Sequence, residues 1–189
     1  MSEHARYLLD AVQSQFTVHA FASGLAAVVA HNPKFAIRDF SGQAQFAPDT
    51  LHAASIQVRI KAASLELMDE VSEYDRGEID RVMFNEVLEV SRFPEIIYTS
   101  TQISATRLSE NLYATTIAGK LTLHGVTNEL DFSAQVVIGD DTLRGYGSFP
   151  VKQSKYDIAI ASIAGGTLKM RDELKIAFFI IAKKAGVIK

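Results

Sequence analysis

The sequence of 189 residues contains no cysteine. Disulfide bonds, thiolate nucleophiles and cysteine-ligated zinc or iron–sulfur clusters are therefore excluded. The fold must be held together by non-covalent contacts. Because 48% of the residues are hydrophobic, a chain of this length can bury a sizeable core, and we expect one domain over residues 1–189.

An excess of basic residues and a long apolar run are also missing. The net charge of -3 and the pI of about 5.9 provide no basic surface for nucleic acid. The longest apolar run, residues 24–30, is far shorter than the ~20 residues of a spanning helix, so we expect no stable membrane insertion. Glu3 and Asp10 lie where a signal peptide would be basic and then apolar. We expect a bacterial-type cytoplasmic protein, or a periplasmic one if a signal peptide has been removed.

Recognisable catalytic and metal-binding motifs are absent as well. The five histidines are scattered and form neither H-x-x-x-H nor H-E-x-x-H, and no serine lies in a G-x-S-x-G turn. The carboxylates of residues 69–80 lack the spacing of a calcium loop and are typical of a helix N-terminus. We therefore expect no enzyme, no metal and no cofactor. For His124, a structural hydrogen bond to the turn backbone is favoured over a contact with a ligand head group.

What the sequence does contain is alternation of apolar and polar residues. In residues 120–138, Leu121 and Leu123 alternate with polar neighbours, and a second alternating stretch follows a break. This pattern predicts a β-hairpin with one apolar face and a loop of several residues between 125 and 129. A hairpin of this kind needs further strands or a helix to cover its apolar face.

Other stretches repeat the strand pattern, most clearly residues 55–61. Further strand-like segments lie at residues 16–20, 35–46, 96–103, 143–149, 158–163 and 174–182. Between residues 69 and 90 the apolar residues recur at helical spacing, which predicts one amphipathic helix from about 72 to 86 with Ser72 at its N-cap. About eight strands and one helix favour an antiparallel barrel or sandwich.

Four stretches taken together resemble the YceI-like polyisoprenoid-binding family. They are Tyr7-Leu-Leu-Asp10 with Ser14 and Phe16, FSGQAQFAPD at residues 40–49, RFPEIIYTST at 92–101, and GKLTLHGVT at 119–127. The resemblance covers nearly the whole chain and looks like a signal-less, cytoplasmic-type branch of the family. It implies an all-β, eight-stranded antiparallel lipocalin-like barrel with one amphipathic helix inserted between strands. It also implies a lumen that binds a long isoprenoid or other amphiphilic chain, and it does not imply an enzyme.

On this basis we expect a non-catalytic carrier or reservoir for a polyisoprenoid, prenyl quinone or fatty acyl chain. The expected ligand-binding residues are Phe16, Val18, Phe40, Phe46, Ile56, Val58, Tyr98, Ser100, Leu121, Leu123, Phe132, Phe149, Ile176 and Phe178. An alternative is a barrel filled by its own side chains that acts as a protein-interaction or stress-response module. An enzyme acting on a lipid head group is a third, less favoured alternative. The sequence leaves open whether the protein forms a homodimer.

Overall fold

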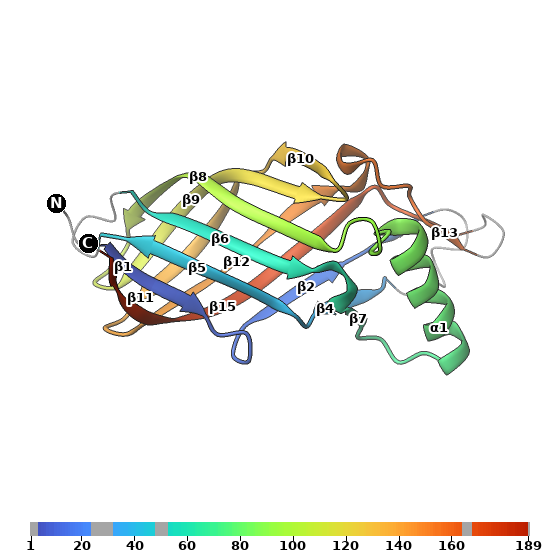
Figure 1. Ribbon diagram of the computed structural model, residues 1–189, viewed down its shortest axis with the longest axis horizontal. Helices are drawn as coiled ribbons and strands as arrows, with labels where there is room; N and C mark the ends of the chain where they lie inside the picture. The colour runs from blue at the N-terminus through green and yellow to red at the C-terminus, as the bar shows by residue number, and fades with distance from the viewer. Residues whose placement is uncertain (1–3, 24–31, 48–52, 164–167, 189) are drawn as a thin grey trace.

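The computed structural model describes residues 4–23, 32–47, 53–163 and 168–188. Its main feature is an elongated barrel of antiparallel strands (Figure 1). One helix lies across one end of the barrel, and the two ends of the chain lie at the other. We refer to these as the helix end and the terminal end.

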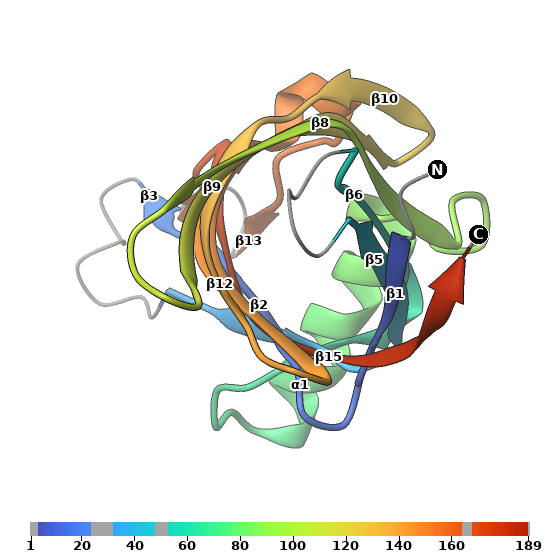
Figure 2. The same cartoon turned by 90° about the vertical axis from the view of Figure 1, so that its left-hand side faces the viewer.

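Eight strands form a closed ring, because the first strand pairs with both the second ring strand and the last strand of the chain (Figure 2). In order around the ring they are β1 (His4–Leu9), β5 (Phe40–Phe46), β6 (Ser55–Lys61), β8 (Glu95–Arg107), β9 (Leu112–Leu123), β11 (Phe132–Ile138), β12 (Thr142–Lys152) and β15 (Glu173–Ile188). The predicted eight-stranded antiparallel lipocalin-like barrel with one inserted helix is confirmed.

Side chains on the ring strands alternate between the inside and the outside of the barrel, as the period of two predicts. On β9, Leu121 and Leu123 are buried, whereas Lys120 is exposed and Thr122 half-buried. On β6, Val58 is buried and Arg59 is exposed. The apolar face of each strand therefore points into the barrel.

Three short strands extend the sheet at the helix end. They are β2 (Gln15–His19), β4 (Lys34–Ile37) and β7 (Leu65–Leu67), and they pair in that order outward from β15. Short breaks at residues 10–14, 38–39 and 62–64 separate them from β1, β5 and β6. The single strand predicted at residues 35–46 is therefore wrong, because the chain changes partners in the middle of it.

Ser14 bridges the first of these breaks. Its hydroxyl donates to the carbonyl oxygen of Ile181 at 3.1 Å and accepts from the amide nitrogen of the same residue at 2.9 Å. A side chain here satisfies backbone groups of β15 that lie between its pairings with β1 and β2. The amide of Ile181 therefore has a partner across the break, and its carbonyl oxygen has a second one, the amide nitrogen of Asp10 at 2.8 Å.

The hairpin turn after β9 is shorter than predicted. His124 and Gly125, with φ angles of 52° and 74°, form a two-residue turn, and β10 (Val126–Glu129) pairs directly with β9. Two successive positive φ angles are the geometry of tight hairpin turns that match the strand twist. The expected loop between residues 125 and 129 is therefore wrong, because residues 126–129 form β10.

The inserted helix connects β7 to β8 and begins where the sequence predicts. It comprises α1 (Glu73–Val82), which continues into a π-helical turn, η3 (Met83–Val87). The hydroxyl of Ser72 accepts from the amide nitrogen of Asp75 at 3.1 Å and donates to its carboxylate at 2.6 Å. The predicted helix and its N-cap are confirmed, and its last turn is wider than an α-helical turn.

A small second sheet lies beside the helix end. It consists of β3 (Ala22–Ser23), β13 (Ser162–Ile163) and β14 (Leu168–Met170). The strand predicted at residues 158–163 is thus largely wrong, since only its last two residues are extended and paired. The buried apolar residues form one large cluster along the barrel and a smaller one at the terminal end.

Candidate ligand-binding cavity

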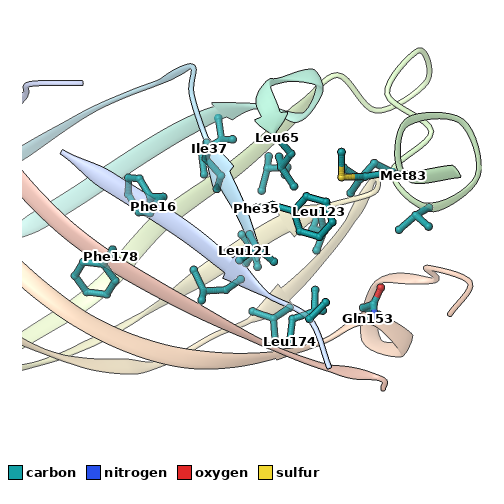
Figure 3. A pocket seen from close by; sticks show the side chains of 18 of the residues that line it. Phe16, Phe35, Ile37, Leu65, Met83, Leu121, Leu123, Gln153, Leu174 and Phe178 are labelled. Carbon is teal, nitrogen blue, oxygen red and sulfur yellow. The ribbon is translucent and has the colours of Figure 1, made fainter. Parts of the chain in front are cut away.

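The barrel encloses a cavity of about 860 Å³, a volume within the usual range of roughly 300–1,000 Å³ for small-molecule sites. It runs from Leu9 and Leu143, next to the terminal end, to α1 and η3 at the helix end. Figure 3 shows the helix end, where labelled side chains from β2, β4, β9 and β15 approach the same space. Almost all the residues along the barrel that line it are apolar.

Aromatic rings surround the middle of the cavity. Phe132 contacts three of them, with ring centroids 5.3 Å from Tyr98, 4.7 Å from Phe149 and 5.6 Å from Phe178. Phe16 lies 6.3 Å from Phe178 on the neighbouring strand. Apart from the Tyr98 hydroxyl, such rings offer an apolar chain a large contact surface without polar atoms to desolvate.

Tyr98 is the ring of this group that carries a hydroxyl. The hydroxyl lies 3.2 Å from the carbonyl oxygen of Leu130, to which it donates. Burial, with a smaller contribution from Asp131, holds the pKa of Tyr98 well above its usual value. The phenol therefore stays protonated near neutral pH and serves as a positioned, uncharged wall residue rather than a proton-transfer group.

Two glycines make room for these rings. A Cβ atom on Gly119 would collide with the Tyr98 hydroxyl, and one on Gly147 would lie 2.9 Å from the ring of Phe178. Any larger residue would push these rings from their positions, so β9 and β12 carry glycine where β8 and β15 carry the bulky partners.

Eleven of the predicted ligand-binding residues line the cavity. They are Phe16, Val18, Ile56, Val58, Tyr98, Leu121, Leu123, Phe132, Phe149, Ile176 and Phe178. The structure brings them together from β2, β6, β8, β9, β11, β12 and β15. That they contact a ligand stays a prediction.

Three predicted residues do not line the cavity. Phe40 packs edge-on against Phe16, with centroids 4.9 Å apart. Phe46 stacks on Tyr7 at 5.1 Å in the terminal-end cluster. The hydroxyl of Ser100 accepts a hydrogen bond from the amide of Ile56 at 2.8 Å, beside an irregularity in the pairing of β8 with β9. Each of these three side chains therefore contacts another part of the protein and does not border the cavity.

Sequence reasoning missed the part of the wall that comes from the helix end. These residues include Phe35, Ile37, Leu65, Leu67, Ile79, Val82, Met83, Val87, Gln153 and Ile158. The helical spacing of Ile79, Val82, Met83 and Val87 already marked an apolar face, which could have placed that face over the open end of a barrel. Nothing local indicated that β4 and β7 would add to the wall.

The lining becomes polar only towards the helix end. Asp69, Asp75, Glu78, Arg81 and Glu86 border the cavity there. Gln153, which is 5% exposed, also lines it and donates from its amide nitrogen to the carbonyl oxygen of Arg171 at 3.0 Å. We call the region bordered by these five charged residues the mouth.

The side chain of His124, in the β9–β10 turn, contacts the segment that follows η3. Its Nε2 lies 2.6 Å from a carboxylate oxygen of Glu89, and its Nδ1 lies 3.1 Å from the carbonyl oxygen of Tyr156. Its ring also packs on Phe93 at 4.4 Å. The predicted hydrogen bond within the turn is wrong, because the acceptors come from two other segments. His124 does not border the cavity.

Neither a metal site nor a spanning helix is found in the described residues. Within them, no group of three or more His, Asp or Glu side chains is placed to hold a metal ion. In the same part of the chain, no helix has the length and apolar character needed to cross a bilayer.

An antiparallel eight-stranded ring around one apolar cavity defines a lipocalin-like barrel. The chain belongs to the YceI-like family, whose domain matches residues 7–182. No curated protein matches the sequence closely enough to add to this.

Solved structures share the fold. BcnA from Burkholderia cenocepacia superposes with a TM-score of 0.71 at 21% identity, covering 93% of this chain and 99% of that one. A polyisoprenoid-binding domain from Saccharophagus degradans, implicated in plant cell wall breakdown, gives 0.68 at 15% identity, covering 94% and 98%. The YCEI protein of Campylobacter jejuni gives 0.61 at 16% identity, covering 83% and 88%. At these identities the likeness establishes a common fold.

Proposed function

We propose that the protein binds a long apolar or amphiphilic chain in the barrel lumen and acts as a non-catalytic carrier or reservoir. The observation that carries this proposal is the cavity of about 860 Å³ with an apolar wall along the barrel. The polyisoprenoid-binding domain from Saccharophagus degradans, which has the same fold, supports a chain of prenyl type.

The size of the cavity sets the length of chain that fits. A water molecule in the liquid takes ~30 Å³, and if a methylene group takes the same volume, the cavity holds on the order of 20 to 30 chain carbons. A chain that buries ~500 Å² gains on the order of 12 kcal/mol at ~25 cal/mol/Å². After several kcal/mol of association and ordering costs, micromolar or tighter binding remains.

The alternative is a barrel filled by its own side chains. In that case the lumen would have no unfilled volume, whereas the rings that line this one leave a continuous space. The cavity therefore favours the carrier over a protein-interaction module.

Native mass spectrometry and solvent extraction of the freshly purified protein would test this function. We expect an apolar molecule to co-purify, and we expect delipidated protein to take up geranylgeraniol. A purified protein whose native mass shows no bound ligand, and which takes up neither prenyl nor fatty acyl chains, would contradict the carrier function.

A matched pair of variants on β12 would locate the binding. Gly145 lines the cavity, and a Cβ atom there meets nothing within 4 Å, so Gly145→Leu fills part of the lumen without a clash at Cβ. Its neighbour Arg144 is exposed on the other face, so Arg144→Leu is the control. We expect Gly145→Leu to lower uptake and Arg144→Leu to leave it unaltered. Equal uptake by both variants would place the ligand outside the lumen.

A further inference from the structure

Acidic residues concentrate at the helix end. Of the 22 acidic residues in the chain, seven lie between residues 69 and 86, with only two of the 19 basic ones. With seven acidic and two basic residues, this segment carries more net negative charge than the whole chain, whose net charge is -3. The segment leads into α1, contains all of it and contains most of η3.

Four of these carboxylates and one cation border the cavity. Asp69, Asp75, Glu78 and Glu86 are joined there by Arg81. The hydrogen bond to Arg81 lowers the pKa of Glu78, which keeps that carboxylate charged. An occupant of the cavity therefore meets a net negative mouth.

Both arginines of the segment are already engaged. Arg81 donates from Nε and Nη2 to the two carboxylate oxygens of Glu78 at 3.1 and 2.7 Å, and from Nη1 to Glu86 at 2.6 Å. Arg76 donates to the carbonyl oxygens of Leu67 and Asp69 at 2.8 and 3.0 Å. A phosphate or carboxylate arriving at the mouth would have to compete with these partners for the two guanidinium groups.

Among the described residues, the wall of the cavity next to the terminal end offers the head group of an amphiphile no polar side chain. Next to the terminal end, the wall is formed by apolar side chains such as Leu9, Ala44, Leu143 and Ile180. A polar group placed there would lose its hydrogen bonds with water and find no replacement. The apolar chain therefore lies deep, and the head group stays at the mouth.

We propose that the mouth selects amphiphiles with an uncharged head group that donates hydrogen bonds, such as an alcohol or an amide, and rejects those with a phosphate or carboxylate head. Carboxylates are strong acceptors for a hydroxyl or amide donor, and they repel an anion. This selectivity presupposes the carrier function proposed above and narrows its ligand class.

Ligands with one chain and different heads test the selectivity. Geranylgeraniol and geranylgeranyl diphosphate share their chain, so the ratio of their dissociation constants isolates the head group. Because the mouth residues are about half exposed, we expect a preference for the alcohol of about tenfold at low salt, and a smaller one when the salt rises from about 0.02 M to about 0.5 M.

A charge variant and its control complete the experiment. Glu78→Gln with Glu86→Gln removes two negative charges at the mouth and frees Arg81, so the preference for the alcohol should fall about tenfold. Glu70→Gln with Glu73→Gln removes the same charge from exposed positions that do not border the cavity, and the preference should remain.

The possible failures are distinguishable. Equal affinity of the unaltered protein for the two ligands, or an equal loss of preference in both double variants, would overturn the selectivity and leave the carrier function standing. No binding of either ligand would overturn both.

Discussion

The two ends of the barrel differ in how they are closed. At the terminal end, β1 completes the strand ring, and Tyr7 and Phe46 stack among small residues, with Ala5 and Ala182 almost fully buried. At the helix end the strands are interrupted, and α1 and η3 cover the opening. The terminal end is a packed plug, whereas the helix end is a covered cavity. Substitutions at the two ends should therefore have different consequences.

The largest effect is expected where charge enters the lumen. Leu123 borders the cavity and is 7% exposed, whereas its neighbour Thr122 faces outward and bonds to Thr127. Leu123→Arg places an unpaired charge among apolar side chains and should cost several kcal/mol of unfolding free energy. Thr122→Arg should cost less than about 1 kcal/mol by the same denaturant titration. Equal tolerance at both positions would contradict the assignment of inner and outer faces.

Truncations at the two ends separate the plug from the cavity. Phe46→Ala should cost about 3–5 kcal/mol, because it leaves a void in a packed cluster. Leu123→Ala should cost about 2 kcal/mol, since the side chain already borders free space. Added geranylgeraniol should raise the melting temperature of Leu123→Ala by mass action, because the altered wall still binds the chain.

Phe46 does not border the cavity. When the unaltered protein and Phe46→Ala are both saturated with ligand, the difference between their unfolding free energies should therefore stay the same. Leu123→Ala should recover part of its loss of unfolding free energy, because the bound chain can fill the space that the leucine leaves. Equal stabilisation of the two variants by the ligand would mean that the chain does not fill that space, since a variant of unaltered affinity gains as much as the unaltered protein.

A smaller effect on the unfolding free energy is expected at His124, which links the β9–β10 turn to the segment after η3. His124→Ala removes the hydrogen bonds with the Tyr156 carbonyl and the Glu89 carboxylate. It should lower the unfolding free energy by about 1 kcal/mol for each bond lost. Affinity for a prenyl chain should change little, because His124 does not border the cavity. His124→Asn is the control, because asparagine tolerates the positive φ of this position. It separates the cost of the backbone conformation from the loss of the imidazole contacts. Affinity that falls tenfold with stability unaltered would make His124 a head-group contact.

The smallest and most gradual effect is expected from acid. The hydrogen bond from Lys183 lowers the pKa of Asp10, that from Ser154 lowers the pKa of Asp172, and that from Arg92 lowers the pKa of Glu89. Each carboxylate therefore stabilises the fold above its unfolded pKa and loses that contribution as the pH falls through its folded pKa. Unfolding free energy should decline below about pH 4 to 5. Replacing Asp10 and Asp172 with asparagine should flatten this decline, and an unaltered slope would contradict it.

Local periodicity predicted the inner faces well and the depth poorly. Alternation on β9 identified Leu121 and Leu123 as inward, because facing depends only on neighbouring residues. Phe46 is also inward, but it lies at the terminal end and belongs to the plug. Position along the barrel axis depends on strand register, which a single strand does not encode. Phe40 is buried as well, but its ring packs edge-on against Phe16 of another strand, and β5 alone does not encode that contact.

The breaks in the strands could not be predicted for a related reason. Residues 38–39 separate β4 from β5 because the two strands pair with different neighbours, which is a property of the assembled sheet. The turn at His124 was misplaced because glycine and asparagine are the usual carriers of positive φ. Here histidine adopts it, and its ring binds Glu89 and the Tyr156 carbonyl, which lie 35 and 32 residues away.

The closure of the ring by β1 and β15 sets the orientation that the protein would have on a support. His4 lies opposite Ile188 in the register of these two strands, so both ends of the chain leave the barrel together, far from α1 (Figure 1). A tether attached at either end would therefore join the barrel at the end opposite the mouth and leave the mouth uncovered. An immobilised or fused form should therefore exchange ligand as freely as the protein in solution.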